Sequence, residues 1–233
     1  MITIYTVTYN EELLIQFMID HYRTRFPGCR IVVNDNMSTD NTAEIALFNG
    51  CEVTQFDSNN QFEDRYNMDF KNNCWKDAKT DWVLMCDLDE LADINEEQLK
   101  TEEDSGTSMV KFEVYDMINM KDNLNFSAMK YGVKSPADSK YFLFNKKFIR
   151  EINYSPGAHA CNPAGKVVYS QNIYKVYHYA SINTDLTIEK FKIRQKRLCP
   201  ENIKMGWGVQ VFMTPEEIRK EYAEERSKAI KVR

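Results

Sequence analysis

The chain has 233 residues, of which 43% are apolar and 28% are charged, and its formal net charge is -5. This length fits one large α/β domain with a complete core, and the composition is that of an ordinary soluble globular protein. The negative charge, with no long basic stripe outside the C-terminal third, argues against a nucleic-acid partner. No apolar run approaches the roughly 18 residues of a membrane-spanning helix, and Met1 leads directly into a strand-like pattern in place of a signal peptide.

The six cysteines are widely scattered, and none of them forms a Cys-x-x-Cys pair that would indicate zinc binding or redox chemistry. Several lie within apolar runs, where cysteine behaves as a small hydrophobic residue. We therefore expect reduced thiols and a cytoplasmic location, although an even number of cysteines would allow disulfide bridges.

The first 90 residues alternate between strand-like and helix-like segments. Apolar, β-branched runs predict strands at residues 2–8, 30–33, 51–56 and 81–86. Helical spacing predicts three helices between them: one capped by Asn10 and ended by Pro27-Gly28, one capped by Ser38 or Asp40 and running to Phe48, and one over residues 62–78. This alternation with short connections predicts an α/β fold with a mostly parallel sheet and helices on both faces.

After residue 90 the pattern becomes less regular. It predicts a short acidic helix at 95–103, strands at 108–115, 140–149 and 166–179, and charged helices at 187–198 and 215–230. The second half is therefore expected to contribute a mixed sheet. Since no internal repeat and no linker rich in Gly, Ser or Pro marks a boundary, we expect a single domain over residues 1–233.

Polar residues follow all four strands of the first half. Thr8-Tyr9-Asn10 follows the first strand, Asp35 the second, Asp57 the third, and Asp87 with Asp89 the fourth. The carboxyl ends of parallel strands meet at one edge of a sheet, and ligands bind at that edge in such folds. The sequence therefore predicts a binding site there.

The run from Trp82 to Cys86 suits a buried strand, but Asp87 and Asp89 cannot be buried unpaired without a cost of several kcal/mol. They must lie where the strand leaves the core, and they need a counter-charge. A hard divalent cation, accompanied by a phosphate-bearing substrate, is the simplest one. The alternative is an acidic turn exposed to water.

Four short motifs occur in a fixed order: Thr8-Tyr9-Asn10, residues 35–40, Lys71-Asn72 and Asp87-Leu88-Asp89. In this arrangement the first 90 positions resemble the nucleotide-sugar half of GT-A fold glycosyltransferases, and the pattern is most similar to glycosyltransferase family 2. That family has Thr-Tyr-Asn after its first strand, Asp-Asp-Gly-Ser-Thr-Asp after another, an Arg-Asn pair and an Asp-x-Asp metal motif. Residues 35–40 match imperfectly, because the second Asp and the Gly are replaced.

Beyond about residue 105 the resemblance to family 2 fades. There, residues 146–150, His159 and His178-Tyr179 resemble related GT-A families whose second half ends in a His-Tyr pair. The resemblance implies a GT-A domain in which residues 1–104 bind the nucleotide sugar and residues 105–233 bind the acceptor.

Such an enzyme moves a sugar from a nucleoside diphosphate to a hydroxyl, and a divalent cation stabilises the leaving diphosphate. The resemblance implies Asp89 as a direct metal ligand, with Asp87 on the metal or on the ribose. It also implies a late histidine, His178, as a further ligand, and a ring nitrogen favours Mn²⁺ over Mg²⁺. The alternative for His178 is a packed ring in an aromatic strand. His159, in an exposed turn, competes for a contact with donor or metal.

The same resemblance assigns the nucleotide to the ends of the first two strands. Asp35 would accept a hydrogen bond from uracil N3–H, and Thr8 would meet the base through its backbone or hydroxyl. Tyr9 could stack on the base, or be a core aromatic, and Asn10 completes the motif. Thymine presents the same edge as uracil, so dTDP-sugars are a second donor class.

The leaving diphosphate needs fixed positive charge. Lys71 ranks first for this contact because of its motif, followed by Arg65 and Arg150. An inverting transfer also needs a carboxylate base beside the acceptor hydroxyl. Asp138, in the turn at residues 135–140, ranks first and Asp116 next. A retaining transfer would need no such base.

We therefore predict a metal-dependent glycosyltransferase that transfers a sugar from a UDP-sugar to a glycan hydroxyl, with inversion. One rival is an NDP-sugar nucleotidyltransferase, but that class needs a glycine-rich loop after its first strand, and residues 8–12 contain no glycine. The other is an inactive GT-A module that binds a glycan or a protein. The sequence does not determine the sugar, the acceptor or the oligomeric state.

Overall fold

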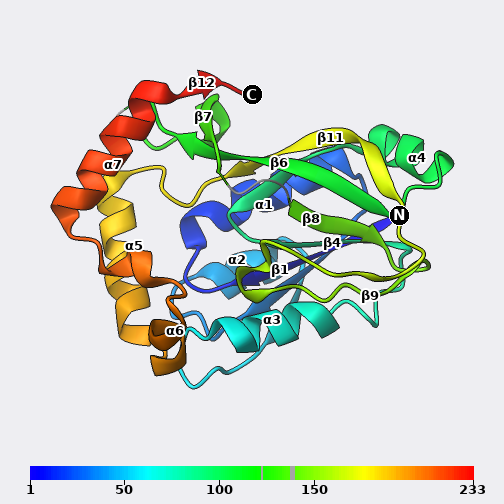
Figure 1. The fold of residues 1–233 in the computed structure, drawn as a ribbon, viewed down its shortest axis with the longest axis horizontal. Coiled ribbons are helices and arrows are strands. Elements are labelled where there is room, and N and C mark those ends of the chain that lie inside the picture. The colour runs from blue at the N-terminus through cyan, green and yellow to red at the C-terminus, as the bar shows by residue number, and fades with distance from the viewer. Residues whose placement is uncertain (122, 137–139) are drawn as a thin grey trace.

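A computed structural model describes residues 1–121, 123–136 and 140–233 (Figure 1). Its centre is a parallel sheet of β1 (Ile2–Thr8), β2 (Arg30–Asp35), β3 (Glu52–Gln55) and β4 (Trp82–Asp87), in the order β3-β2-β1-β4. β1 and β4 are buried along almost their whole length, which explains why their sequences are continuous apolar or β-branched runs without alternation.

The strand order determines which face each helix covers. α1 (Glu12–Arg25) connects β1 to β2, and α2 (Thr42–Phe48) connects β2 to β3, so both connections lead toward the same edge of the sheet. Right-handed crossovers therefore place both helices on the same face, where they pack together. α3 (Asp64–Asn73) returns from β3 to β4 and covers the opposite face (Figure 1). α1 buries an apolar stripe that includes Leu14, Met18 and Tyr22 against the sheet.

The second half extends the sheet with strands of both directions. Its elements are β5 (Glu90–Asp93), α4 (Glu96–Asp104), β6 (Met109–Ile118), β7 (Tyr131–Lys134), β8 (Lys140–Asn145), β9 (Ile149–Glu151), β10 (Ala164–Gly165), β11 (Tyr169–His178) and β12 (Ile230–Lys231). β8 runs antiparallel to β4 and β6, whereas β11 runs parallel to β6 and antiparallel to β5. The predicted α/β fold, with a mixed sheet in its second half, is confirmed.

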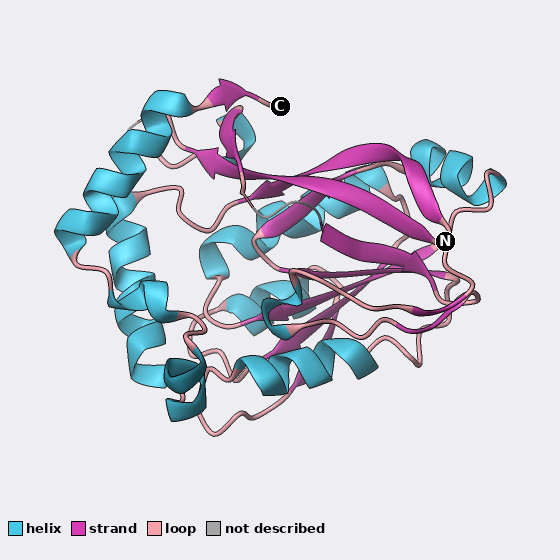
Figure 2. Cartoon of the chain, in the orientation of Figure 1, coloured by secondary structure: helices cyan, strands magenta, loops and turns pink. Residues whose placement is uncertain are grey.

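Three C-terminal helices lie at the carboxyl ends of the parallel strands: α5 (Thr184–Arg197), α6 (Pro200–Met205) and α7 (Pro215–Lys228). They form the left side of the molecule in Figures 1 and 2, at the end of the sheet opposite the N-terminus. α5 packs against α7, and this layer closes the edge of the sheet at which the sequence predicts a site.

Some predicted boundaries are wrong. α1 begins at Glu12 with Glu11 as its N-cap residue, and Asn10 instead has a left-handed backbone, with φ 53°. The Asn10 side-chain oxygen accepts the backbone N–H of Thr39 at 2.8 Å, so it joins two loops and caps no helix. Asp40 does bind helix termini, because its carboxylate accepts backbone N–H groups of Glu12 and Thr42. The third helix ends at Asn73 instead of residue 78.

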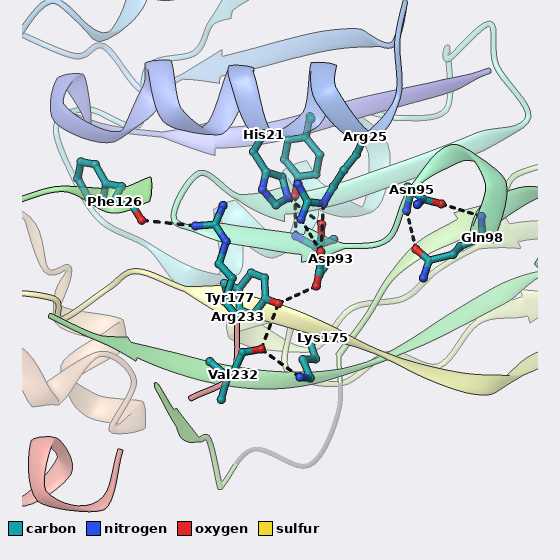
Figure 3. A network of polar contacts seen from close by, with 12 residues as sticks. His21, Arg25, Asp93, Asn95, Gln98, Phe126, Lys175, Tyr177, Val232 and Arg233 are labelled. Carbon is teal, nitrogen blue, oxygen red and sulfur yellow. Dashed lines mark hydrogen bonds and ion pairs between the residues drawn. The ribbon is translucent and has the colours of Figure 1, made fainter. Parts of the chain in front are cut away.

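A buried polar network ties α1 to the second half of the sheet (Figure 3). Arg25 Nε donates to Asp93 Oδ1 at 3.2 Å, and the Tyr177 hydroxyl donates to Asp93 Oδ2 at 2.6 Å. His21 Nε2 donates to the Ala92 carbonyl at 2.8 Å, which makes His21 a structural residue. Arg233 lies over the Tyr177 ring, so the C-terminus is part of the same network.

All six cysteines are free thiols. Among the helices within the described ranges, none has the length and apolar character needed to cross a membrane.

Candidate active site

Strand register brings together a histidine and two carboxylates that are far apart in the sequence. His178, the last residue of β11, pairs with Asp116 of β6 on one side and with Glu90 of β5 on the other. His178 Nδ1 lies 2.7 Å from Asp116 Oδ1, and His178 Nε2 lies 3.9 Å from Asp89 Oδ1. The carboxylate of Asp116 accepts a hydrogen bond from Nδ1–H, so Nε2 faces Asp89 and, when the ring is neutral, carries the lone pair that a metal ion would need.

Lysines neutralise the carboxylates around the end of β4. Lys71 of α3 donates to Asp87 at 2.6 Å, and Lys140 of β8 pairs with Glu90 in a buried ion pair. Lys190 of α5 donates to Asp89 Oδ2 at 3.1 Å. These pairs explain how carboxylates can stay ionised in a region that is largely closed to water.

Electrostatic contacts set the pKa values of these groups. Burial alone would raise the pKa of Asp89, but Lys190, His178 and Arg194 outweigh it and hold that pKa well below its usual range. Burial would lower the pKa of His178, yet the hydrogen bond that His178 donates to Asp116 and the charge of Asp89 raise it.

An aromatic ring and a guanidinium stack at the end of β1. The guanidinium carbon of Arg197 lies 3.3 Å from the centre of the Tyr9 ring, and Arg197 also donates to the side-chain oxygen of Asn36. Beside them, the Thr8 hydroxyl is buried and has no hydrogen-bond partner among the described residues. Arg197 therefore covers one face of the Tyr9 ring and, together with the Ser58 hydroxyl at 3.0 Å, occupies the side-chain oxygen of Asn36.

Two cavities flank this region. The larger, of about 350 Å³, lies between the end of β1 and α5, and its lining includes Tyr9, Glu11, Asp40, Phe62, Lys190, Arg194 and Arg197. The smaller, of about 210 Å³, lies between the ends of β6 and β11 and helix α7, and its lining includes Asp116, His178, Ser181, Gln210, Glu221, Tyr222 and Glu225. His178 and Asp116 thus border the second cavity, and Lys190 borders the first.

The donor groups near Asp89 suit a divalent cation only in part. One carboxylate and one imidazole nitrogen face each other, and the imidazole has a carboxylate behind it, as metal-binding histidines usually do. In the part of the chain that the structure describes, no three His, Cys, Asp or Glu side chains gather closely enough to hold a metal by themselves. Asp89 and His178 therefore fit a cation whose remaining ligands come from substrate and water.

The family model for glycosyl transferase family 2 matches residues 3–177, which is about three quarters of the chain. The chain belongs to glycosyl transferase family 2. The family that the sequence motifs predict is therefore confirmed. The match ends at Tyr177, so the family model includes the Asp-x-Asp segment but neither His178 nor the three C-terminal helices.

Solved structures with a similar fold are distant in sequence. TarS of S. aureus in complex with UDP-GlcNAc is 17% identical with a TM-score of 0.46, and the match covers 84% of this chain and 66% of that one. Glucosyl-3-phosphoglycerate synthase from Mycobacterium tuberculosis, with Mn²⁺ and UDP, is 20% identical with a TM-score of 0.33, covering 48% and 43%. The mannosyltransferase PcManGT from Pyrobaculum calidifontis, with GDP-Man and Mn²⁺, is 20% identical with a TM-score of 0.35, covering 47% and 34%.

The chain spans less than two thirds of the length of the first solved structures that it matches, between 38% and 66%. No curated protein matches its sequence.

Several predicted site residues lie at the edge of the sheet but are already paired. Asp35 is completely buried, and its carboxylate accepts the backbone N–H of Ser38 at 3.1 Å. Asp87 contacts Lys71 and not the Asp89–His178 pair. Arg65 forms an ion pair with Glu201 at 3.0 Å, joining α3 to α6. Of these, Asp87 and Lys71 are next to the proposed metal ligands, whereas Asp35 and Arg65 border neither cavity.

The remaining predicted residues have different surroundings. His159 lies in a turn that packs on α3, with its residue surface largely exposed; partial desolvation of the ring and then the charge of Lys140 lower its pKa. Asp138, the first-ranked base, lies outside the described residues, and the structure therefore gives it no position.

Sequence reasoning missed the residues that α5 contributes to the site. Lys190, Arg194 and Arg197 follow each other at spacings of four and three, which places them on one face of the helix. Lys192 and Lys196 lie on the same helix but are exposed. The spacing was a usable signal, but the sequence alone does not say which of the two basic faces turns inward.

Proposed function

We propose that this glycosyltransferase transfers a sugar from a UDP-sugar to a glycan hydroxyl, with a divalent cation and with inversion at the anomeric carbon. The observation that carries the proposal is the facing pair of Asp89 and His178 Nε2, 3.9 Å apart, with Asp116 holding the other ring nitrogen. Family membership supplies the reaction class, and this pair supplies the place where charge on a leaving diphosphate can be compensated.

Asp89 and His178 would hold the cation, Mn²⁺ being favoured over Mg²⁺ by the imidazole ligand. A cation bound there would act as a Lewis acid on the diphosphate and offset the charge that develops as the glycosidic bond breaks. The Lys71 ammonium lies 2.6 Å from the carboxylate of Asp87. This ion pair keeps Asp87 ionised and in place to contact the metal or the ribose.

Tyr9 and Asn36 are the proposed base-binding groups. The Arg197 guanidinium stacks on the Tyr9 ring and donates to Asn36, and a uracil ring with its N3–H can make the same two kinds of contact. Asn36, in place of the predicted Asp35, is the proposed acceptor for the base: its buried side-chain oxygen accepts from Ser58 and Arg197 and would accept from the base once Arg197 moves away, whereas the carboxylate of Asp35 is closed onto the backbone of Ser38.

Asp116 is the proposed catalytic base. One of its oxygens holds His178 Nδ1, and within the described ranges the carboxylate has no other hydrogen-bond partner. Asp116 borders the smaller cavity, which we propose receives the acceptor. Asp116 would take the hydroxyl proton as the acceptor oxygen attacks the anomeric carbon, while the bond from that carbon to the diphosphate oxygen breaks.

The donor is tested by titrating UDP, GDP, dTDP and CDP with Mn²⁺ by calorimetry, and by assaying hydrolysis of the matching nucleotide sugars. UDP is expected to bind best, and Asp89→Asn is expected to remove metal-dependent binding. Asp77→Asn is the matched control, since Asp77 is exposed and away from the site. Equal binding by wild type and Asp89→Asn would reject the metal site. Binding with no turnover of any donor would favour an inactive module.

A further inference from the structure

Lys190 joins two carboxylates that come from different parts of the chain. Its ammonium lies 2.6 Å from Glu11 Oε1, at the start of α1, and 3.1 Å from Asp89 Oδ2, after β4. The side chains of Glu11 and Asp89 are only 16% and 9% exposed, so water screens these contacts poorly. One lysine charge is therefore shared by two buried carboxylates.

The two oxygens of Asp89 face different cationic or metal-binding partners. Oδ2 contacts Lys190, whereas Oδ1 faces His178 Nε2. A divalent cation between Asp89 and His178 would lie close to the Lys190 ammonium, and like charges at such distances repel strongly in a poorly hydrated site. Lys190 and a metal ion therefore compete for the same carboxylate.

A second position for the ammonium is available in the larger cavity. Lys190 and Arg194 both border it, and Lys190 carries its charge on a flexible four-carbon stem that can swing without movement of the helix. The Arg194 guanidinium lies 5.7 Å from the centre of the Phe62 ring, and its charge lowers the pKa of Asp89, but its side chain makes no hydrogen bond or ion pair with any described residue. The cavity wall thus offers a diphosphate one arginine that is not ion-paired and one lysine that can be released.

On the basis of the proposed function, we infer that Lys190 is a donor-binding residue that exchanges partners. Without donor it holds Asp89 together with Glu11. When donor and metal bind, Lys190 leaves Asp89 and pairs with the diphosphate. The charge balance agrees with this exchange: Glu11, Asp89 and Lys190 sum to -1, a divalent cation changes the sum to +1, and an anionic diphosphate then brings compensating charge.

The exchange predicts opposite effects of one substitution on two ligands. In Lys190→Met, Mn²⁺ alone should bind about 5-fold or more tightly than in wild type, because Asp89 has lost its competitor. UDP, titrated at saturating Mn²⁺, should bind about 10-fold more weakly, because the diphosphate has lost a cation. Mn²⁺ binding is measured by the loss of the free-ion electron paramagnetic resonance signal, and UDP binding by calorimetry.

Two further variants control the measurement. Lys192→Met removes a charge from the exposed face of the same helix, where Glu189 is the only described residue that pairs with Lys192, and should change neither affinity. Lys190→Arg keeps the charge and should keep Mn²⁺ binding within about twofold of wild type. It also reports on the site if Lys190→Met is found by circular dichroism to be unfolded.

The outcomes separate this inference from the proposed function. If wild type binds no UDP with Mn²⁺, the proposed function fails and the inference fails with it. If wild type binds UDP but Lys190→Met shifts both affinities in the same direction, or neither, only the exchange is overturned. A tighter affinity for both ligands would identify Lys190 as a blocking group, and a weaker affinity for both would identify it as a structural one.

Discussion

The ion pair between Lys140 and Glu90 allows a quantitative test of how the site is supported. The two side chains are 6% and 5% exposed, and Glu90 directly follows Asp89 and pairs in register with His178. Replacing Lys140 by Met removes the ammonium and leaves a buried carboxylate without its partner. A carboxylate in that position must be desolvated without compensation or become protonated.

The expected cost of Lys140→Met is about 3–5 kcal/mol in the free energy of unfolding. For a chain of this size, about 2–4 °C of melting temperature corresponds to each kcal/mol, so Tm should fall by about 6–20 °C. Replacing both partners, as in Lys140→Met with Glu90→Leu, removes the unpaired charge as well. The double variant should therefore recover most of the loss.

The assay is chemical denaturation monitored by circular dichroism, with a surface pair as control. Lys147 and Asp81 form an ion pair whose side chains are 63% and 42% exposed, and Lys147→Met should cost less than about 1 kcal/mol. The reasoning is refuted if Lys140→Met costs no more than Lys147→Met. It is also refuted if the double variant loses the sum of the two single losses, because the pair would then not act as a unit.

Three further predictions concern the base, the nucleotide and pH. Asp116→Asn keeps an acceptor for His178 and should leave UDP affinity within about tenfold while lowering kcat about 10²-fold or more; an unchanged kcat would remove Asp116 as the base. Arg197→Met frees the Tyr9 ring and should tighten UDP binding about threefold in calorimetry, whereas weaker binding would make Arg197 part of the base site. Burial lowers the pKa of His21 to about 3, so the unfolded chain takes up a proton near pH 6.5 that the folded protein does not, and stability rises with pH across that window. Between pH 7.5 and pH 5, wild type should lose about 2 kcal/mol through this group, and urea titrations of His21→Gln should lack that loss.

The first half of the fold could be predicted because its signals are local. β1 and β4 are buried runs that end at polar residues, and such runs separated by helix-length segments have few arrangements other than a parallel sheet. Parallel strands also bring their carboxyl ends to one edge, so the region of Asp87 and Asp89 could be expected there. What local signals could not give was the partner of each carboxylate.

The partners come from segments that are distant in the chain. Lys140 is 50 residues from Glu90, and Lys190 is 101 residues from Asp89. Glu11 shows the difficulty most directly: in sequence it is a favourable charge at a helix start, yet its side chain pairs with α5. Asp35 is the reverse case, because its place at the end of β2 indicates a ligand contact but its carboxylate closes on the turn that follows.

Register in the second half decides the remaining part of the site. β11 pairs with β6 in parallel and with β5 antiparallel, and only in that register does His178 lie between Asp116 and the end of β4. A shift by one residue would turn Tyr177 or Tyr179 toward Asp116 and remove the imidazole from Asp89. Tyr177 and Tyr179 are both buried, and Tyr177 is fixed by its hydrogen bond to Asp93 at 2.6 Å. The aromatic residues on either side of His178 therefore hold the register, so the same segment is a packed strand and carries the histidine that we propose as a metal ligand.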